Sequence, residues 1–407
     1  MHIVFIEAST TGPGEKALDY CRDMAYFITL ITRKPDMYSE IFTTKVNNLI
    51  CCETNNLTEL KQVVEKLNFK KRIDGITTTA DVFLPNAAKL ANDLGLVSLN
   101  YESVLQVRNK YLMRKNLQVF CPHLNPPFAM VKDYLNAKLN AEKIGYPLIA
   151  KPQDANDSWK VTKINNLFEL ESYMKDSESW GNNDFNQPFT DGVLLEGFIE
   201  GNEYSVETVQ YKNNDIELIG VTTRTLEGSV EVGASFPVLD KGLKDNLFNS
   251  VKEALIKLDI DCGVIHTECR IKDNQVKILE INPRLAGSKI GSHLIELSTG
   301  ENPLKHVVEI ALNQYNKFTL KKNAASAYVS IPMPKSGVFK GIKNLEVLKK
   351  MQGVVEIDIV GELGRIYPKI PSSNNDRIIK VVTHANEHVQ ALQLAENVKN
   401  KAKIIVE

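Results

Sequence analysis

The sequence predicts a multidomain protein in which an N-terminal α/β domain with an open parallel sheet is followed by α+β domains. Three observations lead to this prediction. The chain has 407 residues, enough for about two to four domains. Strand and helix patterns alternate with short connections up to residue 99, which favours a parallel sheet. Beyond residue 190, strand patterns follow one another directly, as in antiparallel sheets.

The composition is that of an ordinary globular protein, with 43% hydrophobic residues, 24% charged residues and a net charge of −1. This balance gives no reason to expect a nucleic-acid partner. Residues 1–7 read as a strand and lack the features of a signal peptide. No apolar run approaches the ~20 residues that span a bilayer, so no membrane partner is expected. The six cysteines form no metal-type C-x-x-C pair, and free thiols in a cytoplasmic protein are the simplest account.

The first domain is expected over residues 1–104. Its predicted strands are 2–7, 27–31, 49–52, 74–77 and 96–99. Three helices are predicted: one that ends near residue 26, one over 57–67 and one over 81–94. The loop Gly12-Pro13-Gly14 resembles a dinucleotide-binding fingerprint only weakly, because it lacks the third glycine and the acidic residue of that pattern. We interpret it as a tight turn into a helix, and its amides could also meet a substrate carboxylate.

A second domain is expected over residues 105–315, with a small subdomain over about 122–195 that begins in a proline-rich linker. Its predicted strands are 128–131, 146–152, 159–164, two strands within 192–207, 215–224 and 230–236, and its predicted helices are 101–117, 133–144, 166–175 and 243–258. A C-terminal α+β segment over 316–407 is expected to complete the large lobe. Its predicted strands are 325–331, 354–359 and 378–382, before a final helix over 386–401.

The strongest chemical signal lies within residues 264–288, where two apolar-alternating runs flank a short polar segment and predict a β-hairpin. Side chains two residues apart on a strand share a face. His266 and Glu268 therefore lie together on the first strand. Glu280 and Asn282 lie together on the second strand.

The turn of this hairpin decides whether the two glutamates meet. A two-residue turn at Asp273-Asn274 in a regular hairpin would place Glu268 and Glu280 on opposite faces. A three-residue loop from Asp273 to Gln275 would set the two glutamates directly opposite each other. We predict the three-residue loop, because Asn tolerates the left-handed conformation that such loops need.

Two carboxylates and an amide oxygen on one face make a good site for Mg²⁺, which prefers hard oxygen ligands. Glu268, Glu280 and Asn282 are therefore the candidate metal ligands. Without a cation, the two facing carboxylates would repel each other. The alternative is that they are solvated residues on an exposed face of a sheet. Pro283 ends the strand, and Arg284 follows in a loop beside the site, able to bind phosphate or carboxylate with two hydrogen bonds.

Other candidates are weaker when each is taken alone. Lys151 ends an apolar strand just before a proline, so its ammonium group would emerge at the lip of a sheet, suited to phosphate or simply exposed. Lys110 is one lysine among many on a helix. The strand end 196–199 could receive a base against apolar side chains, and Glu203 suits ribose hydroxyl groups.

Two further residues have open roles. His266 could orient a substrate carboxylate or an attacking amine, or be a hydrogen-bonded histidine that lines the cleft. Glu231 could bind a substrate ammonium group, or be a solvated strand residue.

Taken in order, these features resemble the ATP-grasp superfamily of carboxylate–amine ligases over about residues 105–310, most closely its L-amino-acid ligase and carnosine-synthase-like branch. The resemblance is carried by the opening run 6–14, by His266-Thr267-Glu268 and by the run 280–287. It implies that residues 1–104 form a pre-ATP-grasp domain. It also implies an ATP-grasp fold over 105–315, in which two α+β subdomains clasp ATP.

The resemblance also implies roles for individual residues. Lys110 and Lys151 would contact the phosphates of ATP, Glu196, Phe198 and Ile199 would contact adenine with Lys151 nearby, and Glu203 would contact the ribose. Two Mg²⁺ ions, with Mn²⁺ as an alternative, would be bound by Glu268, Glu280 and Asn282. Substrate contacts would come from Arg284, Gly287 and Glu231. Arg284 would stabilise the acyl phosphate and the tetrahedral intermediate. The mobile phosphate loop departs from the family pattern, because residues 153–159 contain no glycine and two acids, although Ser158 keeps the usual place.

The function implied is an ATP-dependent ligase. It would activate an amino acid or other small carboxylate as an acyl phosphate and join it to an amine, usually a second amino acid. One alternative is an enzyme of the purine or carboxylase type, although no Met-Lys-Met-type biotin lysine is present. Another is a degenerate ATP-binding regulatory protein, supported only by the loop 153–159. Proteins of this superfamily are often homodimers, and the sequence itself indicates no interface.

Overall fold

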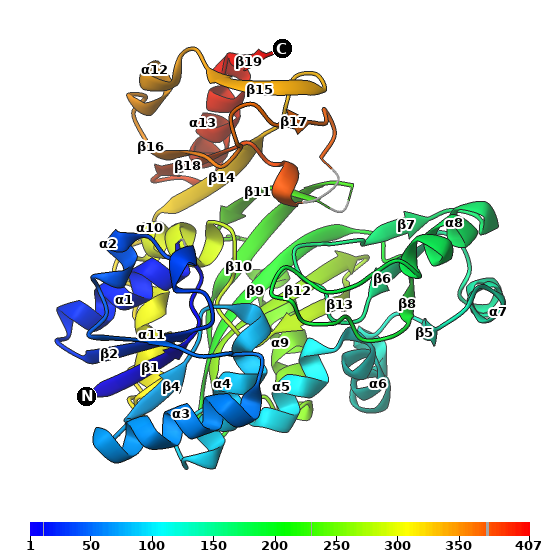
Figure 1. Cartoon of the computed structure of the whole chain (residues 1–407). Coiled ribbons are helices and arrows are strands. Elements are labelled where there is room, and N and C mark those ends of the chain that lie inside the picture. Colours follow the sequence, from blue (N-terminus) through cyan, green and yellow to red (C-terminus); the bar gives the residue numbers. More distant parts are fainter. Residues whose placement is uncertain (11, 229, 372–373) are drawn as a thin grey trace.

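The computed structural model describes residues 1–10, 12–228, 230–371 and 374–407 (Figure 1). Thr11 of the opening run and Ser229 beside the Glu231 candidate lie outside the described residues. No helix within these ranges is long and apolar enough to cross a membrane. All six cysteines are free thiols.

The N-terminal region forms the predicted open parallel sheet, in the order β3-β2-β1-β4. Its strands are β1 (His2–Ile6), β2 (Phe27–Thr32), β3 (Asn48–Cys51) and β4 (Gly75–Thr77). Its helices are α1 (Pro13–Asp23), α2 (Glu40–Thr43), α3 (Leu57–Lys70) and α4 (Leu84–Asp93). The buried strands read as almost continuous apolar runs because helices cover both faces of such a sheet.

The strand predicted at 96–99 is wrong. These residues form a connection in which Leu96 closes the end of α4 through a hydrogen bond from its amide to the carbonyl of Ala91. The carbonyl of Leu99 accepts a hydrogen bond from the side chain of Asn92 at 3.2 Å. The apolar residues of this run are packed against the core. A short apolar run has no periodicity that separates a buried strand from a buried connection.

A central antiparallel sheet carries the site. Its eight strands lie in the order β13-β12-β9-β10-β11-β14-β18-β16. They are β9 (Asn202–Tyr211), β10 (Asp215–Glu227), β11 (Val230–Phe236), β12 (Gly263–Lys272), β13 (Gln275–Asn282), β14 (Ala325–Ile331), β16 (Val354–Ile359) and β18 (Ile379–Ala385). The C-terminal segment thus contributes three strands to the sheet that the middle of the chain begins.

A smaller sheet, which we call the lid, projects from one side of the central sheet (Figure 1). Its strands β5 (Phe128–Val131), β8 (Val193–Gly197), β6 (Leu148–Pro152) and β7 (Thr162–Ile164) pair in that order, all antiparallel. Helices α7 (Tyr134–Ile144) and α8 (Leu167–Ser177) share its core. Helices α5 (Tyr101–Arg108) and α6 (Lys110–Phe120) connect the N-terminal sheet to the lid.

The remaining elements complete the body of the molecule. They are α9 (Lys241–Lys257), α10 (Ile295–Thr299), α11 (Pro303–Ala311), α12 (Leu345–Lys349), α13 (His388–Lys401), β15 (Gly337–Ile342), β17 (Ile366–Tyr367) and β19 (Ile404–Val406). The three short strands β17, β15 and β19 form a separate small sheet that the sequence did not predict. The domain limits at residues 104 and 315 stay predictions.

The hairpin of β12 and β13 differs from the prediction in one informative way. Lys272 pairs with Gln275, which leaves a two-residue turn at Asp273 and Asn274. Both turn residues have positive φ angles, 49° and 64°, as a type I′ turn requires. The predicted three-residue loop is therefore wrong.

The two glutamates nevertheless lie opposite each other. Glu268 pairs with Glu280, whereas the next residue of β12, Cys269, pairs with Ile278. Leu279 is thus the extra residue of a β-bulge. Beyond this one-residue insertion, the side chains of β13 point to the face opposite to the one expected for a regular hairpin. The insertion therefore compensates for the two-residue turn and brings both glutamates onto one face.

Candidate active site

A cleft of about 620 Å³ lies between the lid and the central sheet. Every residue that the sequence singled out lines it: Lys110, Lys151, Ser158, Glu196, Phe198, Ile199, Glu203, Glu231, His266, Glu268, Glu280, Asn282, Arg284 and Gly287. These residues come from α6, the lid, the central sheet and the loop after β13. The fold therefore gathers side chains that are up to 177 residues apart in the sequence, from position 110 to position 287.

Lys110 begins helix α6, which Asn109 caps by accepting a hydrogen bond from the amide of Leu112. The Nζ atom of Lys110 is 2.9 Å from Oε1 of Glu280 and donates to the carbonyl oxygen of Ala155 at 2.6 Å. This lysine is buried and partnered, so it is not an ordinary surface residue. It links the loop 153–159 to a candidate metal ligand.

Lys151 and Glu196 form an ion pair at 2.8 Å between neighbouring lid strands. Burial lowers the pKa of Lys151, and the carboxylate of Glu196 opposes that effect. Burial would raise the pKa of Glu196, but Arg114 and Lys151 bring it down to about 2. Both groups are therefore held together at the edge of the cleft.

Arg114 is a functional residue that sequence reasoning missed. Its side chain is fully buried, and its Nε atom is 2.7 Å from Oε1 of Glu196. Its two terminal nitrogens donate to the carbonyl oxygens of Ile278 and Leu279 at 2.7 and 2.8 Å. Arg114 thus ties α6 and the lid to the β-bulge that brings Glu280 opposite Glu268. The only sequence signal was an arginine in a helix that is otherwise amphipathic.

His266 lies between two carboxylates. Its Nδ1 is 2.9 Å from Oε1 of Glu207, and its Nε2 is 3.2 Å from Oε1 of Glu268. Burial would lower the pKa of His266, but Glu207 and Glu268 raise it to about 9. The ring is therefore an imidazolium that donates in both directions. This arrangement favours the alternative of a hydrogen-bonded histidine, one that orients Glu268.

Arg224 is a second residue that sequence reasoning missed. Its guanidinium group, on β10, contacts three carboxylates from three neighbouring strands: Glu203 at 3.2 Å, Glu231 at 2.8 Å and Glu268 at 2.5 Å. Burial would raise the pKa of Glu268, yet Arg224 holds it well below its usual range. Glu268 is consequently ionised and already neutralised by a cation of the protein.

Glu231 is partnered inside the protein. Besides Arg224, it accepts a hydrogen bond from the hydroxyl group of Tyr328, and Nη1 of Arg377 lies 4.0 Å from its carboxylate. It is buried. This environment disfavours both sequence-based readings, the solvated strand residue and the free carboxylate that binds an ammonium group.

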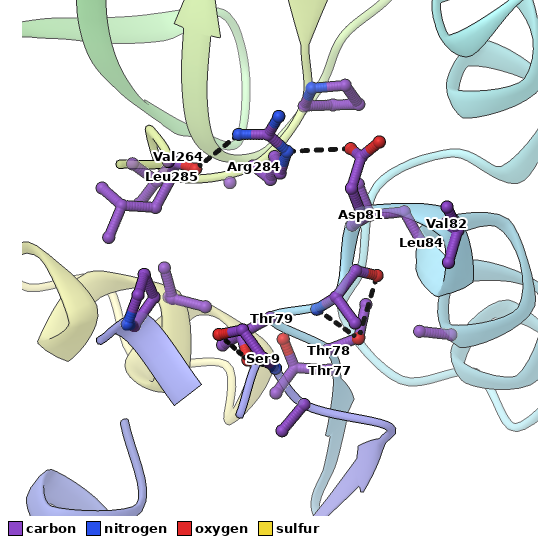
Figure 2. Close-up of a pocket in the computed structure, with 18 of the residues that line it drawn as sticks. Ser9, Thr77, Thr78, Thr79, Asp81, Val82, Leu84, Val264, Arg284 and Leu285 are labelled. Carbon is purple, nitrogen blue, oxygen red and sulfur yellow. Dashed lines mark hydrogen bonds and ion pairs between the residues drawn. The ribbon is translucent and has the colours of Figure 1, made fainter. Parts of the chain in front are cut away.

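Arg284 is held by the N-terminal domain. Its Nε is 2.8 Å from Oδ1 of Asp81, and its Nη1 donates to the carbonyl oxygen of Leu285 at 3.0 Å (Figure 2). Burial would raise the pKa of Asp81, but Arg284 and Arg108 bring it down to about 2. Asp81 thus orients the guanidinium group, and no sequence pattern pointed to it.

A second cavity of about 450 Å³ adjoins the first (Figure 2). Arg284, Gly287 and Ser288 line both cavities, so the two spaces meet at the loop after β13. Residues from the N-terminal sheet, among them Ser9 and Thr77–Thr79, form its polar wall. The N-terminal domain therefore shapes a space of a size that suits a small molecule.

The loop Gly12-Pro13-Gly14 behaves as the tight turn that the sequence favoured. The amide of Gly14 donates to Oγ of Ser9 at 2.8 Å. A Cβ atom at Gly14 would lie 1.9 Å from the carbonyl oxygen of Ser9, so only glycine fits there. The Gly14 amide is thereby used inside the loop.

The loop 153–159 is anchored to the lid. The carboxylate of Asp154 accepts hydrogen bonds from Thr190, and the side chain of Gln153 donates to the carbonyl of Asp191 at 2.6 Å. Asp157 and Ser158 have positive φ angles of 54° and 56° and line the cleft. One of the two unexpected acids thus stabilises the loop, and the other faces the cleft.

The donor set fits Mg²⁺ with help from a ligand. Among the described residues, no three His, Cys, Asp or Glu side chains already surround one point as a metal site. Two facing carboxylates, Glu268 and Glu280, and the nearby amide of Asn282 supply only part of an octahedral shell. Mg²⁺ is commonly bound by one or two carboxylates plus substrate phosphates. The set therefore fits an ion that arrives with a nucleotide.

Comparison with known proteins gives consistent matches. A family model described as an ATP-grasp domain matches residues 144–292. The L-arginine-specific L-amino acid ligase of Bacillus subtilis is 23% identical over 381 residues, covering 90% of this chain and 89% of that protein.

Solved structures agree in fold. An L-amino acid ligase from Bacillus licheniformis matches with a TM-score of 0.83 at 21% identity, over 100% of this chain and 98% of that one. The biotin carboxylase domain of a 2-oxoglutarate carboxylase from Hydrogenobacter thermophilus, in complex with MgADP, matches with a TM-score of 0.71 at 15% identity, over 100% of this chain and 90% of that one.

Proposed function

We propose that this chain, of which residues 144–292 match a family model described as an ATP-grasp domain, is an ATP-grasp ligase that joins a small carboxylate, such as an amino acid, to an amine. The observation that carries the proposal is the facing pair of Glu268 and Glu280, in a cleft that also contains two buried lysines. The likeness to L-amino acid ligases supports a second amino acid as the amine.

In this proposal the first cavity receives ATP. Lys110 and Lys151 contact the phosphates, with Ser158 from the loop above them. The strand end with Glu196, Phe198 and Ile199 receives adenine, and Glu203 receives the ribose. The burial of Lys110, Lys151 and Glu196 supports the assignment, because electrostatic contacts are stronger where water is excluded.

Glu268, Glu280 and Asn282 would hold two Mg²⁺ ions, for which Mn²⁺ could substitute. Bound there, the ions would supply positive charge to the phosphate oxygens. Glu280 lies 2.9 Å from Nζ of Lys110, so the lysine and an ion would share this carboxylate. His266 acts on Glu268 as a positioning residue.

The reaction takes two steps. A carboxylate oxygen of the substrate attacks the γ-phosphorus of ATP, the bond to ADP breaks, and an acyl phosphate forms. The amine nitrogen then attacks the acyl carbon, phosphate leaves with the bonding electrons, and the nitrogen loses a proton to solvent. The protein supplies no nucleophile, and Lys110, Lys151 and Arg284 neutralise the charge that develops.

The carboxylate substrate is expected in the second cavity, beside Arg284 and Gly287. Arg284 is oriented by Asp81 and lies where the two cavities meet. An arginine there can stabilise the acyl phosphate and the tetrahedral intermediate. Glu231 contributes to the substrate site only by positioning Arg224 and Arg377, because its carboxylate is already paired with them.

The function is tested by measuring phosphate release from ATP and Mg²⁺ with single amino acids and with pairs, while product mass is read. We expect release that requires a pair, with a product mass equal to the sum of the two minus water. Release with one amino acid alone would indicate an acyl phosphate that leaks to water. Bound ATP without release under any condition would contradict the ligase proposal.

Arg224 leads to a separate prediction about metal binding. Its guanidinium group neutralises Glu268 in the protein without ligands, so it competes with a metal ion for that carboxylate. The variant Arg224→Met is expected to bind Mn²⁺ without nucleotide about tenfold more tightly than the wild type, because Glu268 loses the guanidinium group that competes with the ion. Electron paramagnetic resonance of free Mn²⁺ measures this.

The matched control is Arg72→Met, since the side chain of Arg72 is 88% exposed. It should bind Mn²⁺ as the wild type does. Equal Mn²⁺ affinity of Arg224→Met and the wild type, both folded by circular dichroism, would show that Arg224 does not occupy the metal position.

A further inference from the structure

The C-terminal segment contributes a basic side chain to the second cavity. Lys380, on β18, lines this cavity together with Arg284, and these are the two basic side chains among its described lining residues. The two differ in their partners. Arg284 has its counter-ion, because Asp81 lies 2.8 Å away. Within the described ranges, the side chain of Lys380 has neither a hydrogen bond nor an ion pair.

The carboxylates closest to Lys380 are already committed to other cations. Asp358 is its partner in the register of β16 and β18, but Oδ2 of Asp358 is 3.2 Å from Nζ of Lys289. Glu231 is paired with Arg224 at 2.8 Å. Among the described residues, both of these carboxylates are therefore already paired with other cations.

The surroundings of Lys380 make a bound anion favourable. The lysine is only partly exposed, and Arg377 and Lys289 add positive charge around it. Burial, together with these two cations, lowers the pKa of Lys380 to about 8. At neutral pH the ammonium group is thus charged in most molecules, and an anion beside it would relieve both the desolvation and the repulsion.

We propose that Lys380 forms a subsite for a second carboxylate, distinct from the carboxylate that is activated beside Arg284. This inference rests on the proposed function, because it assigns a second role within one substrate cavity. Lys380 and Arg284 both line the cavity of about 450 Å³, which apolar residues such as Val264, Leu304 and Ile310 also line.

Two substrates of a ligation reaction can supply this carboxylate. One is a donor with two carboxylates, such as an acidic amino acid. The other is the amine partner, if it is an amino acid with its own free carboxylate. Both present the same group to Lys380, and kinetics with neutral analogues separates them.

The experiment compares the wild type with Lys380→Met and Lys380→Arg in the phosphate-release assay. Donors are tested as glutamate against glutamine, and acceptors as free amino acids against their amides. Lys380→Met is expected to raise KM for the carboxylate-bearing partner by about 10- to 100-fold, with KM for ATP unchanged. Lys380→Arg should retain the preference of the wild type. Lys335→Met, at an exposed lysine, is the matched control and should behave as the wild type.

The pattern of loss identifies the source. A loss with glutamate but not glutamine assigns the carboxylate to the donor, and a loss with free amino acids but not their amides assigns it to the acceptor. An equal change in KM for carboxylates and neutral analogues, or no change at all, overturns the subsite.

A binding measurement keeps the subsite separate from the ligase activity. Glutarate, which carries two carboxylates and no amine, should raise the Tm of the wild type more than butyrate does, and should not raise that of Lys380→Met. If the wild type releases no phosphate but this stabilisation depends on Lys380, the ligase proposal fails and the subsite stands. If glutarate stabilises both proteins equally or neither, the subsite is overturned.

Discussion

The variant Glu280→Gln is expected to lose ATP turnover by about 10²-fold or more while it stays folded. Glu280 faces Glu268 across the hairpin and contacts Lys110 at 2.9 Å. Glutamine keeps the shape of the side chain but removes the negative charge that a divalent ion needs. The side chain is 26% exposed, and glutamine keeps an oxygen that can accept a hydrogen bond from the buried Lys110.

Phosphate release under saturating substrates measures this loss, and circular dichroism with thermal melting checks the fold. Mn²⁺ binding in the presence of nucleotide should weaken in parallel. The control is Glu346→Gln, because Glu346 also faces a lysine, Lys349 at 3.3 Å, but lies on the surface. If Glu280→Gln turned over ATP as fast as the wild type, the assignment of Glu280 as a metal ligand would be wrong.

The variant Arg114→Met is expected to lower the free energy of unfolding by about 3–5 kcal/mol, the range found when one partner of a buried ion pair is removed. Arg114 is fully buried, and it donates to Glu196 and to two main-chain carbonyls of the β-bulge. Its loss leaves one face of the Glu196 carboxylate and both carbonyl groups without donors. Lys151 compensates Glu196 only in part, because it contacts the other oxygen.

Urea unfolding followed by circular dichroism measures the effect. Arg114→Lys should recover little stability, since an ammonium group cannot reach three acceptors in the geometry of a guanidinium group. Arg72→Met again serves as the exposed control and should change the free energy of unfolding by less than about 0.5 kcal/mol. A similarly small change in Arg114→Met would contradict the role we assign to this arginine.

The predictions from sequence succeeded where local pattern decides structure. Continuous apolar runs and short connections predicted the parallel N-terminal sheet, and alternating runs predicted the hairpin of β12 and β13. The candidates Lys151 and Arg284 line the cleft because each stands at or just beyond the end of a predicted strand, whereas Lys110, expected within a helical stretch 101–117, lines it because a helix begins at this residue. Their roles stay predictions until the variants are measured.

The sequence by itself predicted most of the elements and the candidate residues of the site, because periodicity, proline and turn residues act over a few positions. Only the tertiary structure decided how these residues are partnered. The bulge at Leu279 is held by Arg114, and Arg284 is held by Asp81, across 165 and 203 positions of the chain. The role of Arg224 likewise depends on carboxylates from other strands, and that of Lys380 depends on its place in the second cavity. Such pairings depend on distances through space, and no periodicity in the sequence records them.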